Sequence, residues 1–332
     1  MSIFRANISI LNKFLNNFAP CFTKKQLAMF ILIIYAMFKD YKRNSLEAMA
    51  QAVHTDYQKL QYFFSESKWD LQAIKQKRMD IIQKQRTTAT TKDGILTIDD
   101  TGCPKPFAKQ TEAAKWQYCG SLKRSEICNV AVGAAFVSKA KHFPIDVVPY
   151  LPADEFPEGK KDLHFKDKIQ IAIELFDNAL ESFDFSATSF DSWYSAKRFL
   201  EHIHAKERIF YSEIKSNRNI FTYHPVKKKY CMVKPGELVT LIKKYYADKI
   251  KSVTSKSADG SEVSYKTYSF DATLKDCKVP LKFVVILGKW NKDDDNKYHV
   301  LITNQLNVTA KTVITNYLLR WGIEQCFKEL KD

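Results

Sequence analysis

The chain has 332 residues, a formal net charge of +15 at pH 7 and a sequence pI near 9.3. Its hydrophobic content of 45% is that of a globular protein with room for two or three domains, which excludes a disordered tail. The excess of positive charge favours a polyanionic partner, and nucleic acid is the most common one for a globular chain of this kind.

Neither a membrane nor a soft metal is favoured by the sequence. The one strongly apolar run, residues 28–38, is too short to cross a bilayer and has lysines on both sides. The first residues lack the apolar region and cleavage site of a secretory signal, so we expect a cytoplasmic protein with no membrane partner. The seven cysteines include no C-x-x-C pair, and the seven histidines show no zinc-binding spacing.

The first part of the chain is predicted to be helical. Apolar residues recur with helical periodicity over four segments: 27–38, 46–53, 60–64 and 71–82. Ser45 is a predicted N-cap, and Thr55 with Gln58 is a predicted capping box shortly after the preceding helix. Two short helices joined by a tight turn fit a DNA-binding helix-turn-helix or an ordinary helical bundle, and both interpretations stay open. A polar stretch, residues 83–93, is the predicted linker.

From residue 94 the pattern changes to alternating short strands and helices. Strands are predicted over residues 94–101, 127–137, 147–150, 187–191 and 298–303, and helices over residues 165–180 and 195–204. Three early strands, a helix, a strand and a helix predict an α/β fold with a mixed sheet covered by helices. This is the order of elements in ribonuclease-H-like cores.

Residues 210–297 are several times longer than one helix and one strand require. Apolar and polar residues alternate around Val263 and Tyr265, and residues 281–287 are almost wholly apolar, so we predict a β-rich insertion. Its first half is basic, with three consecutive lysines: Lys227, Lys228 and Lys229. This run fits either a phosphate-facing surface or a solvated face.

The end of the chain carries a spaced set of polar residues in the pattern Y-x2-R-x3-E-x6-K: Tyr317, Arg320, Glu324 and Lys331. At roughly 100° per residue of a helix, the four side chains lie within about 60° of one another on one stripe. A carboxylate between two cations and a phenol suits a phosphodiester, because the acid can hold a divalent metal while the other groups bind phosphate oxygens. A solvated amphipathic helix has a similar pattern, so the helix alone does not distinguish a phosphodiester-binding site from an ordinary surface helix.

Three acids on rigid elements are enough for two-metal phosphoryl transfer. The first comes from Asp99 or Asp100, where strand alternation lets only one side chain face the site and parity does not say which. The second is Asp191, at the carboxyl end of a short strand, and the third is Glu324. A turn or helix-cap role would explain each aspartate taken alone. Oxygen ligands of this kind favour Mg²⁺ or Mn²⁺.

The Y-x2-R-x3-E-x6-K spacing resembles the YREK signature of bacterial insertion-sequence DDE transposases. The segments IDDTGCPK, WQYCGSL, CNVAV and SFDSWYSAKRFLE resemble catalytic segments of one branch of that family, and DYQKLQYFFSESKWD resembles its helical entry region. The resemblance selects Asp100, which directly precedes a threonine. It implies that Asp100, Asp191 and Glu324 are catalytic and bind two Mg²⁺ or Mn²⁺ ions.

The resemblance also implies a fold and its division into domains. The fold is a ribonuclease-H-like mixed sheet flanked by helices, with an α-helical N-terminal domain and a β-rich insertion before the last catalytic helix. The implied domains are a DNA-binding domain (residues 1–88), a catalytic core in two parts (residues 89–209 and 298–332) and the insertion (residues 210–297).

The implied activity is cut-and-paste DNA transposition. Water hydrolyses a phosphodiester at the end of the element, and the released 3′-hydroxyl attacks target DNA. Tyr317, Arg320 and Lys331 would hold phosphates beside the cut. Trp290 is either a stacking partner for a DNA base or a packing residue. The partners are double-stranded DNA, as inverted-repeat ends and as target, and a second copy of the chain in a DNA-bridged homodimer associated with the nucleoid.

One departure from the family bears on activity. Relatives usually continue with a helical segment, whereas this sequence ends one residue after Lys331. Two other interpretations therefore stay open: a truncated or domesticated, catalytically silent DNA-binding protein, and a ribonuclease-H-like nuclease without strand transfer.

Overall fold

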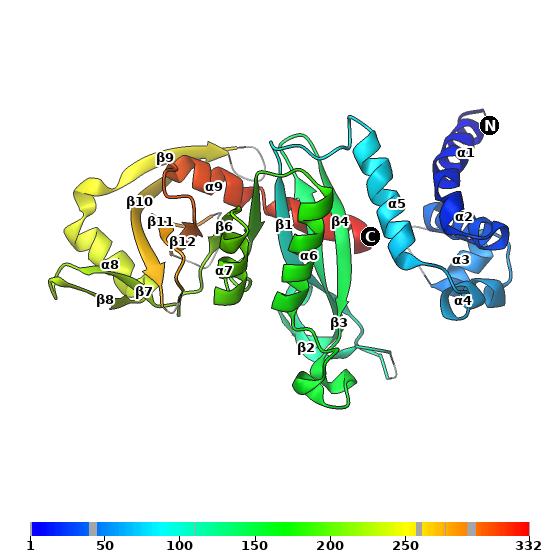
Figure 1. Ribbon diagram of the computed structural model, residues 1–332, viewed down its shortest axis with the longest axis horizontal. Coiled ribbons are helices and arrows are strands. Elements are labelled where there is room, and N and C mark those ends of the chain that lie inside the picture. The colour runs from blue at the N-terminus through cyan, green and yellow to red at the C-terminus, as the bar shows by residue number, and fades with distance from the viewer. Residues whose placement is uncertain are drawn as a thin grey trace. The chain divides into compact units, whose positions relative to one another are not determined.

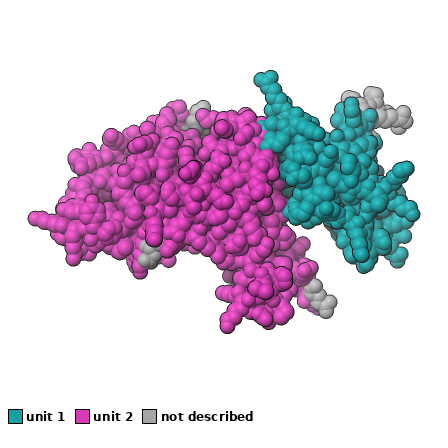
Figure 2. Space-filling model, in the orientation of Figure 1, with its two compact units in different colours: residues 1–89, 329–332 teal, residues 90–328 magenta. Residues whose placement is uncertain are grey.

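The computed structural model describes residues 2–39, 45–109, 111–256, 261–275, 277–290 and 297–331. It divides into two compact units, which Figure 2 shows in different colours: unit 1 is residues 1–89 with 329–332, and unit 2 is residues 90–328. Over the described stretches, no helix is long and apolar enough to cross a membrane.

Unit 1 is helical, as predicted. Its helices are α1 (Ser2–Leu15), α2 (Lys24–Lys39), α3 (Leu46–Ala52), α4 (Tyr57–Ser65) and α5 (Leu71–Lys84), with a short 3₁₀ helix between α1 and α2 (Asn16–Cys21). The four predicted helices are confirmed as α2 to α5. Apolar side chains from α2, α3 and α4 form one buried cluster: Ile33, Ala36, Met49, Ala50, Leu60 and Phe63. This packing explains why three short helices are stable together.

The helix caps confirm one prediction and correct another. The Ser45 hydroxyl accepts a hydrogen bond from the Ala48 backbone N–H at 3.2 Å, as predicted. The predicted cap at Thr55 is wrong, because the Asp56 carboxylate accepts from the Gln58 N–H at 2.9 Å and caps α4 instead. A carboxylate also interacts favourably with the positive end of the helix dipole, which a threonine hydroxyl does less well.

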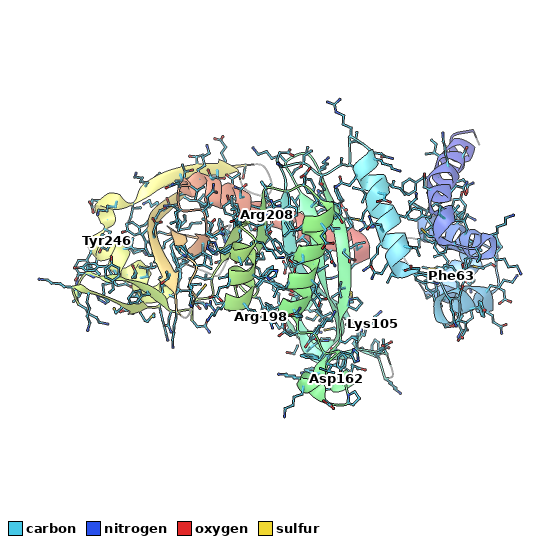
Figure 3. The ribbon with its side chains drawn as sticks, viewed as in Figure 1. Phe63, Lys105, Asp162, Arg198, Arg208 and Tyr246 are labelled. Carbon is cyan, nitrogen blue, oxygen red and sulfur yellow. The ribbon has the colours of Figure 1, made fainter. Side chains whose placement is uncertain are left out.

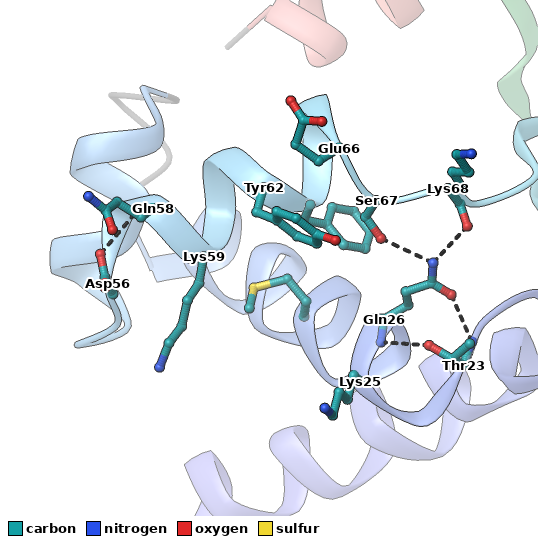
Figure 4. A pocket seen from close by; sticks show the side chains of 12 residues that line it. Thr23, Lys25, Gln26, Asp56, Gln58, Lys59, Tyr62, Glu66, Ser67 and Lys68 are labelled. Carbon is teal, nitrogen blue, oxygen red and sulfur yellow. Dashed lines mark hydrogen bonds between the residues drawn. The ribbon is translucent and has the colours of Figure 1, made fainter.

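A reciprocal cap occurs at the start of α2 instead. The Thr23 N–H donates to Gln26 Oε1 at 2.9 Å, and the Gln26 N–H donates to Thr23 Oγ1 at 3.3 Å. Gln26 Nε2 also donates to Ser67 Oγ at 3.0 Å and to the Lys68 carbonyl at 2.7 Å (Figure 4). These bonds tie the start of α2 to the segment after α4, beside a groove of about 690 Å³.

Unit 2 is built on a mixed sheet. Its strands are β1 (Ile95–Pro104), β2 (Lys115–Cys119), β3 (Arg124–Val137), β4 (His142–Tyr150), β5 (Ala187–Phe190), β6 (Ile209–Glu213), β7 (Ile220–His224), β8 (Lys229–Val233), β9 (Lys251–Lys256), β10 (Glu262–Leu274), β11 (Leu281–Ile286) and β12 (His299–Thr303). Among the described residues their order is β2-β3-β1-β5-β6-β12-β11-β10-β7-β8, with β4 on β3 and β9 on β10. β5 runs parallel to β1 and β6, and the other pairs are antiparallel.

The helices of unit 2 are α6 (Lys168–Ser182), α7 (Lys197–Ala205), α8 (Pro235–Tyr245), α9 (Ala310–Leu318) and α10 (Trp321–Lys331). Every strand and helix predicted between residues 94 and 204 is confirmed, and so is the strand near residue 300. The helix α8 was not predicted, because it lies in a segment read as β-rich. Pro235 at its first turn and buried Leu238, Leu241 and Ile242 explain why it is helical.

The two faces of the sheet carry different helices. Figure 1 shows α6 crossing the near face of β1, β3 and β4 while the red C-terminal helix passes behind them. Arg198 of α7, labelled in Figure 3, pairs with Asp167, the N-cap residue of α6, and so joins these two helices. A Cβ added at Gly133 of β3 would meet the Phe327 ring of α10 at 2.6 Å. The backbone of β3 therefore approaches α10 closely at this point.

The C-terminal segment corrects one expectation. One helix was expected over residues 317–332, but the structure has two, α9 and α10, which are separated at Leu319 and Arg320. Three backbone hydrogen bonds mark the break: from the Arg320 N–H to the Tyr317 carbonyl at 3.0 Å, from the Gly322 N–H to the Leu319 carbonyl at 3.0 Å and from the Ile323 N–H to the Arg320 carbonyl at 3.1 Å. Such three-residue spacing is typical of a 3₁₀ turn. The stripe is continuous only from Arg320 onward.

We predict that Gly133→Ala destabilises the protein by about 1–3 kcal/mol, because the new methyl group displaces the Phe327 ring or the strand. The matched control is Gly120→Ala, where an added Cβ meets no described atom within 4 Å. Urea unfolding of both variants gives the comparison. Equal free energies of unfolding for the two variants would contradict the close approach of β3 and α10.

Candidate active site

The two adjacent aspartates of β1 point to opposite faces of the sheet. Asp99 is paired with Gly133 in the β1–β3 register, so both residues face α10. Asp100 is one residue further and faces α6, where its Oδ2 lies 2.5 Å from Lys168 Nζ. α10 therefore lies on the face of the sheet that Asp99 presents, and Lys168 of α6 lies on the face that Asp100 presents.

Asp191 reaches the same edge of the sheet from the neighbouring strand. β5 runs parallel to β1 with Phe190 level with Ile98, so the next residue, Asp191, comes level with Asp99. The Asp191 carboxylate accepts hydrogen bonds from the backbone N–H groups of Trp193 at 2.9 Å and Tyr194 at 3.3 Å. These bonds fix its orientation at the start of the loop that leads into α7.

The guanidinium of Arg320 joins the acids. Its Nη1 lies 2.7 Å from Asp99 Oδ2, and its Nη2 lies 2.9 Å from Glu324 Oε1. The charge of Asp191 also acts on it. Arg320 is only 8% exposed, and within the described part of the chain its Nε has no hydrogen-bond partner. One buried cation therefore lies among three carboxylates from β1, the end of β5 and α10.

The site is electrostatically crowded. Burial raises the pKa of Asp99 from its ordinary value of 3.8 to about 8, although the charge of Arg320 acts in the opposite direction. The neighbouring carboxylates of Asp191 and Asp100 add to the increase. Burial likewise raises the pKa of Asp191, against the effect of Arg320. Negative charge is concentrated here beyond what one guanidinium neutralises, and this is the condition that a divalent cation relieves.

Asp100 has a different environment from the one expected. Its partner Lys168 opens α6, and Lys168 Nζ also lies 5.3 Å from the centre of the Trp193 ring and 5.5 Å from that of Tyr150. It is Asp99, and not Asp100, that shares the Arg320 cation with Glu324, and the catalytic role expected of Asp100 stays a prediction. Lys168 was missed in the sequence, since 68 positions separate it from Asp100 and no local motif connects them.

Two aromatic residues predicted to contact DNA are buried. Tyr317 is 4% exposed, and its hydroxyl donates to Glu213 Oε2 at 3.1 Å. Trp290 is 8% exposed and lies in ring contact with four neighbours: Tyr265, His299, Tyr317 and Trp321. Their burial opposes base stacking on Trp290 and favours the packing interpretation. Glu213, which also bonds His299 Nδ1 at 2.8 Å, was not recognised in the sequence.

The remaining predicted residues lie outside this cluster. Lys331 is exposed near the end of α10, seven residues beyond Glu324 and hence on the same helical stripe. Lys228 lies in the turn between β7 and β8, with Lys227 before it and Lys229 at the start of β8. Their roles in DNA binding stay predictions.

The donor set suits a hard cation. Within the residues described, no three His, Cys, Asp or Glu side chains lie close enough together to form a metal site. The Arg320 guanidinium binds Asp99 and Glu324 through its two terminal nitrogens. The carboxylates of Asp99, Asp191 and Glu324 would nevertheless fit Mg²⁺ or Mn²⁺ once that guanidinium moves, because both ions prefer carboxylate oxygens.

Comparisons with known proteins agree with a nuclease site. A family profile described as "DDE superfamily endonuclease" matches residues 17–271, which is more than half of the chain and includes Asp99 and Asp191 but not Glu324. A protein of Microchaete diplosiphon named "Probable transposase for insertion sequence element IS701" is 30% identical over 186 residues, or 54% of this chain. The aligned region spans 47% of that relative, about half of its length.

We predict that Arg320→Gln lowers the free energy of unfolding by about 3 kcal/mol in the presence of a chelator, because it leaves buried carboxylates without their cation. The matched control is Arg124→Gln, which removes a pair to Glu126 at 3.0 Å from a side chain that is 68% exposed. That change should stay within about 0.5 kcal/mol. Similar losses in both variants would show that Arg320 is not the centre of a buried charge cluster.

Proposed function

The chain belongs to the DDE superfamily of endonucleases, and from this premise we propose that it is an insertion-sequence transposase. It cleaves DNA at the ends of an element and joins the released ends to target DNA. One observation carries the proposal: Arg320 gathers Asp99 and Glu324 on one buried guanidinium next to Asp191. The similarity to a relative named as a transposase supports the same activity.

The strand order supports a ribonuclease-H-like core in unit 2. An antiparallel set, β4-β3-β1, continues into the parallel strands β5 and β6, with α6 and α7 on one face. In this proposal residues 89–209 and 298–332 form the catalytic core, residues 210–297 are the insertion, and residues 1–88 bind DNA. The acids then lie at the carboxyl ends of neighbouring parallel strands, where open α/β sheets hold their ligands.

We assign the catalytic triad to Asp99, Asp191 and Glu324. These residues would hold one or two divalent cations, and a cation bound there activates water and stabilises the leaving oxygen in phosphodiester hydrolysis. Asp100 stays paired with Lys168 on the other face, 2.5 Å away, and supports the end of β1. In this way adjacent aspartates have separate roles.

The residues of the chain perform the remaining steps. Arg320 leaves the carboxylates and pairs with a DNA phosphate, which a guanidinium can bind through two nitrogens. Glu324, whose side chain is 55% exposed, then turns toward the aspartates. The backbone N–H groups of Trp193 and Tyr194 hold Asp191 in place throughout. Binding of DNA therefore prepares the site by removing the cation that neutralises it.

The partners follow from the reaction. The formal charge of +15 favours association with duplex DNA, both as inverted-repeat ends and as target. Joining two ends requires two active sites held together, so a second copy of the chain is the expected partner in a DNA-bridged homodimer.

We expect Glu324→Gln to abolish cleavage of a labelled inverted-repeat end in Mg²⁺ while leaving most DNA binding intact, because the amide keeps the shape but loses the charge needed to hold a cation. Gel analysis separates the outcomes: cleavage with joining supports a transposase, and cleavage alone indicates a nuclease. If the wild-type chain binds DNA but never cuts it, the protein is a silent DNA-binding protein and the proposal fails.

The two adjacent aspartates provide the sharpest comparison. Asp99→Asn should lower the cleavage rate by at least about 10²-fold, the scale of losing a catalytic group. Asp100→Asn should lower the cleavage rate only about tenfold, the smaller loss typical of a supporting residue. A larger loss of cleavage rate in Asp100→Asn than in Asp99→Asn would show that Asp100 is the first catalytic acid.

Metal binding provides a test that does not depend on cleavage. Without DNA, Arg320→Gln should bind Mn²⁺ about tenfold more tightly than the wild-type chain, because no guanidinium must first leave the carboxylates. Electron paramagnetic resonance of free Mn²⁺ measures the affinity. Asp191→Asn in the same background is the control and should remove the gain. Weaker Mn²⁺ binding by Arg320→Gln would contradict the proposal that the Arg320 guanidinium leaves the carboxylates when a metal ion binds.

A further inference from the structure

The β7–β8 hairpin carries large apolar and aromatic side chains on a face that is exposed to solvent. In the register of the two strands, Phe221 is opposite Met232 and Tyr223 is opposite Tyr230. All four side chains lie on the outer face. Phe221 is 41% exposed, Met232 and Tyr223 are each 43% exposed, and Tyr230 is 65% exposed. The alternate residues Ile220, Thr222, His224 and Val233 are buried. The hairpin therefore fills the core from one face and presents an aromatic surface on the other.

The aromatic side chains form a connected row. The ring of Tyr230 lies 5.9 Å from that of Phe221 and 5.7 Å from that of Tyr223, measured between centroids. Their planes are inclined by 36° and 68°, respectively. Rings held by strand backbone and by one another lose little freedom when a planar ligand stacks on them, which favours binding.

Cations border the row at both ends. One end is the turn with Lys227, Lys228 and Lys229. At the other end Phe221 and Met232 line a shallow pocket of about 500 Å³ together with Lys197, Thr273, Leu274, Cys277 and Lys278. Residues 214–236 include five lysines and one arginine but no aspartate or glutamate. The charge around the aromatic row is thus complementary to a polyanion.

We propose that this outer face of the β7–β8 hairpin binds unpaired DNA, with bases stacked on the Phe221, Tyr223 and Tyr230 rings and phosphates next to the lysines at the two ends. The inference rests on the proposed function, because it takes DNA as the substrate. Aromatic platforms beside basic side chains are the usual means of binding single strands, and bases in a duplex already stack on one another. An apolar protein partner would not need cations at both ends of the surface.

The test measures affinity for a labelled oligothymidylate and for a duplex of the same length, using the full chain in a chelator so that nothing is cut. Tyr230→Ala and Tyr223→Ala should each weaken single-strand binding about tenfold, within the range for loss of one stacking ring. Tyr230→Phe should keep the wild-type affinity. Duplex binding should change little in all three variants.

Two controls separate stacking from charge. Replacing Lys227, Lys228 and Lys229 by Gln should weaken binding of both DNAs and reduce the slope of log K against log salt by about 2 for the single strand. The ring variants should keep the wild-type slope. Tyr245→Ala, on α8 and 41% exposed, is the matched aromatic control and should have no effect. Thermal melting confirms that each variant is folded.

Single-strand binding unchanged by Tyr230→Ala and Tyr223→Ala, with a clear loss in the lysine variant, would overturn the stacking proposal and leave the proposed function untouched. Equal weakening by Tyr245→Ala would also overturn it, because the effect would not belong to the hairpin. Failure of the wild-type chain to bind either DNA would overturn the hairpin proposal and the proposed function together.

Discussion

The ion pairs of Arg320 connect the central strand β1 to the C-terminal helix α10. They join Asp99 of β1 to Glu324 of α10, two residues that are 225 positions apart in the sequence. A buried guanidinium is costly unless carboxylates surround it, and closely spaced carboxylates are costly unless a cation lies among them. Each half of the cluster therefore requires the other, and α10 must lie on the face of the sheet that Asp99 presents.

In the proposed function, the same arrangement lets the folded site exist before a metal ion and DNA bind. Without a metal, Arg320 supplies the positive charge, and burial with the neighbouring acids still raises the pKa of Asp99. A divalent cation carries more charge at the centre and a DNA phosphate offers the guanidinium a new partner, so exchange is favourable when both are present. This view links cleavage to DNA binding without a separate regulatory element.

Much of the framework was predictable because it is local. The period of apolar residues located helices α2 to α5 and the strands β1, β3 and β5, and residue type identified Asp191 and Glu324 as candidate acids. Which of Asp99 and Asp100 faces α10 could not be predicted locally, since it depends on the approach of Gly133 to Phe327, across 194 positions. The burial of Trp290 and the partner of Asp100 likewise depend on contacts between distant segments.

The most direct measurement is the anomalous diffraction of a crystal containing Mn²⁺ and a DNA end. If Asp99, Asp191 and Glu324 are the catalytic acids, we expect metal density bounded by their carboxylates, with the Arg320 guanidinium moved from Asp99 to a phosphate. Metal density at Asp100 with Arg320 still bound to Asp99 and Glu324 would contradict it. In that case the ion pairs seen here would be a permanent structural support and not the resting state of the active site.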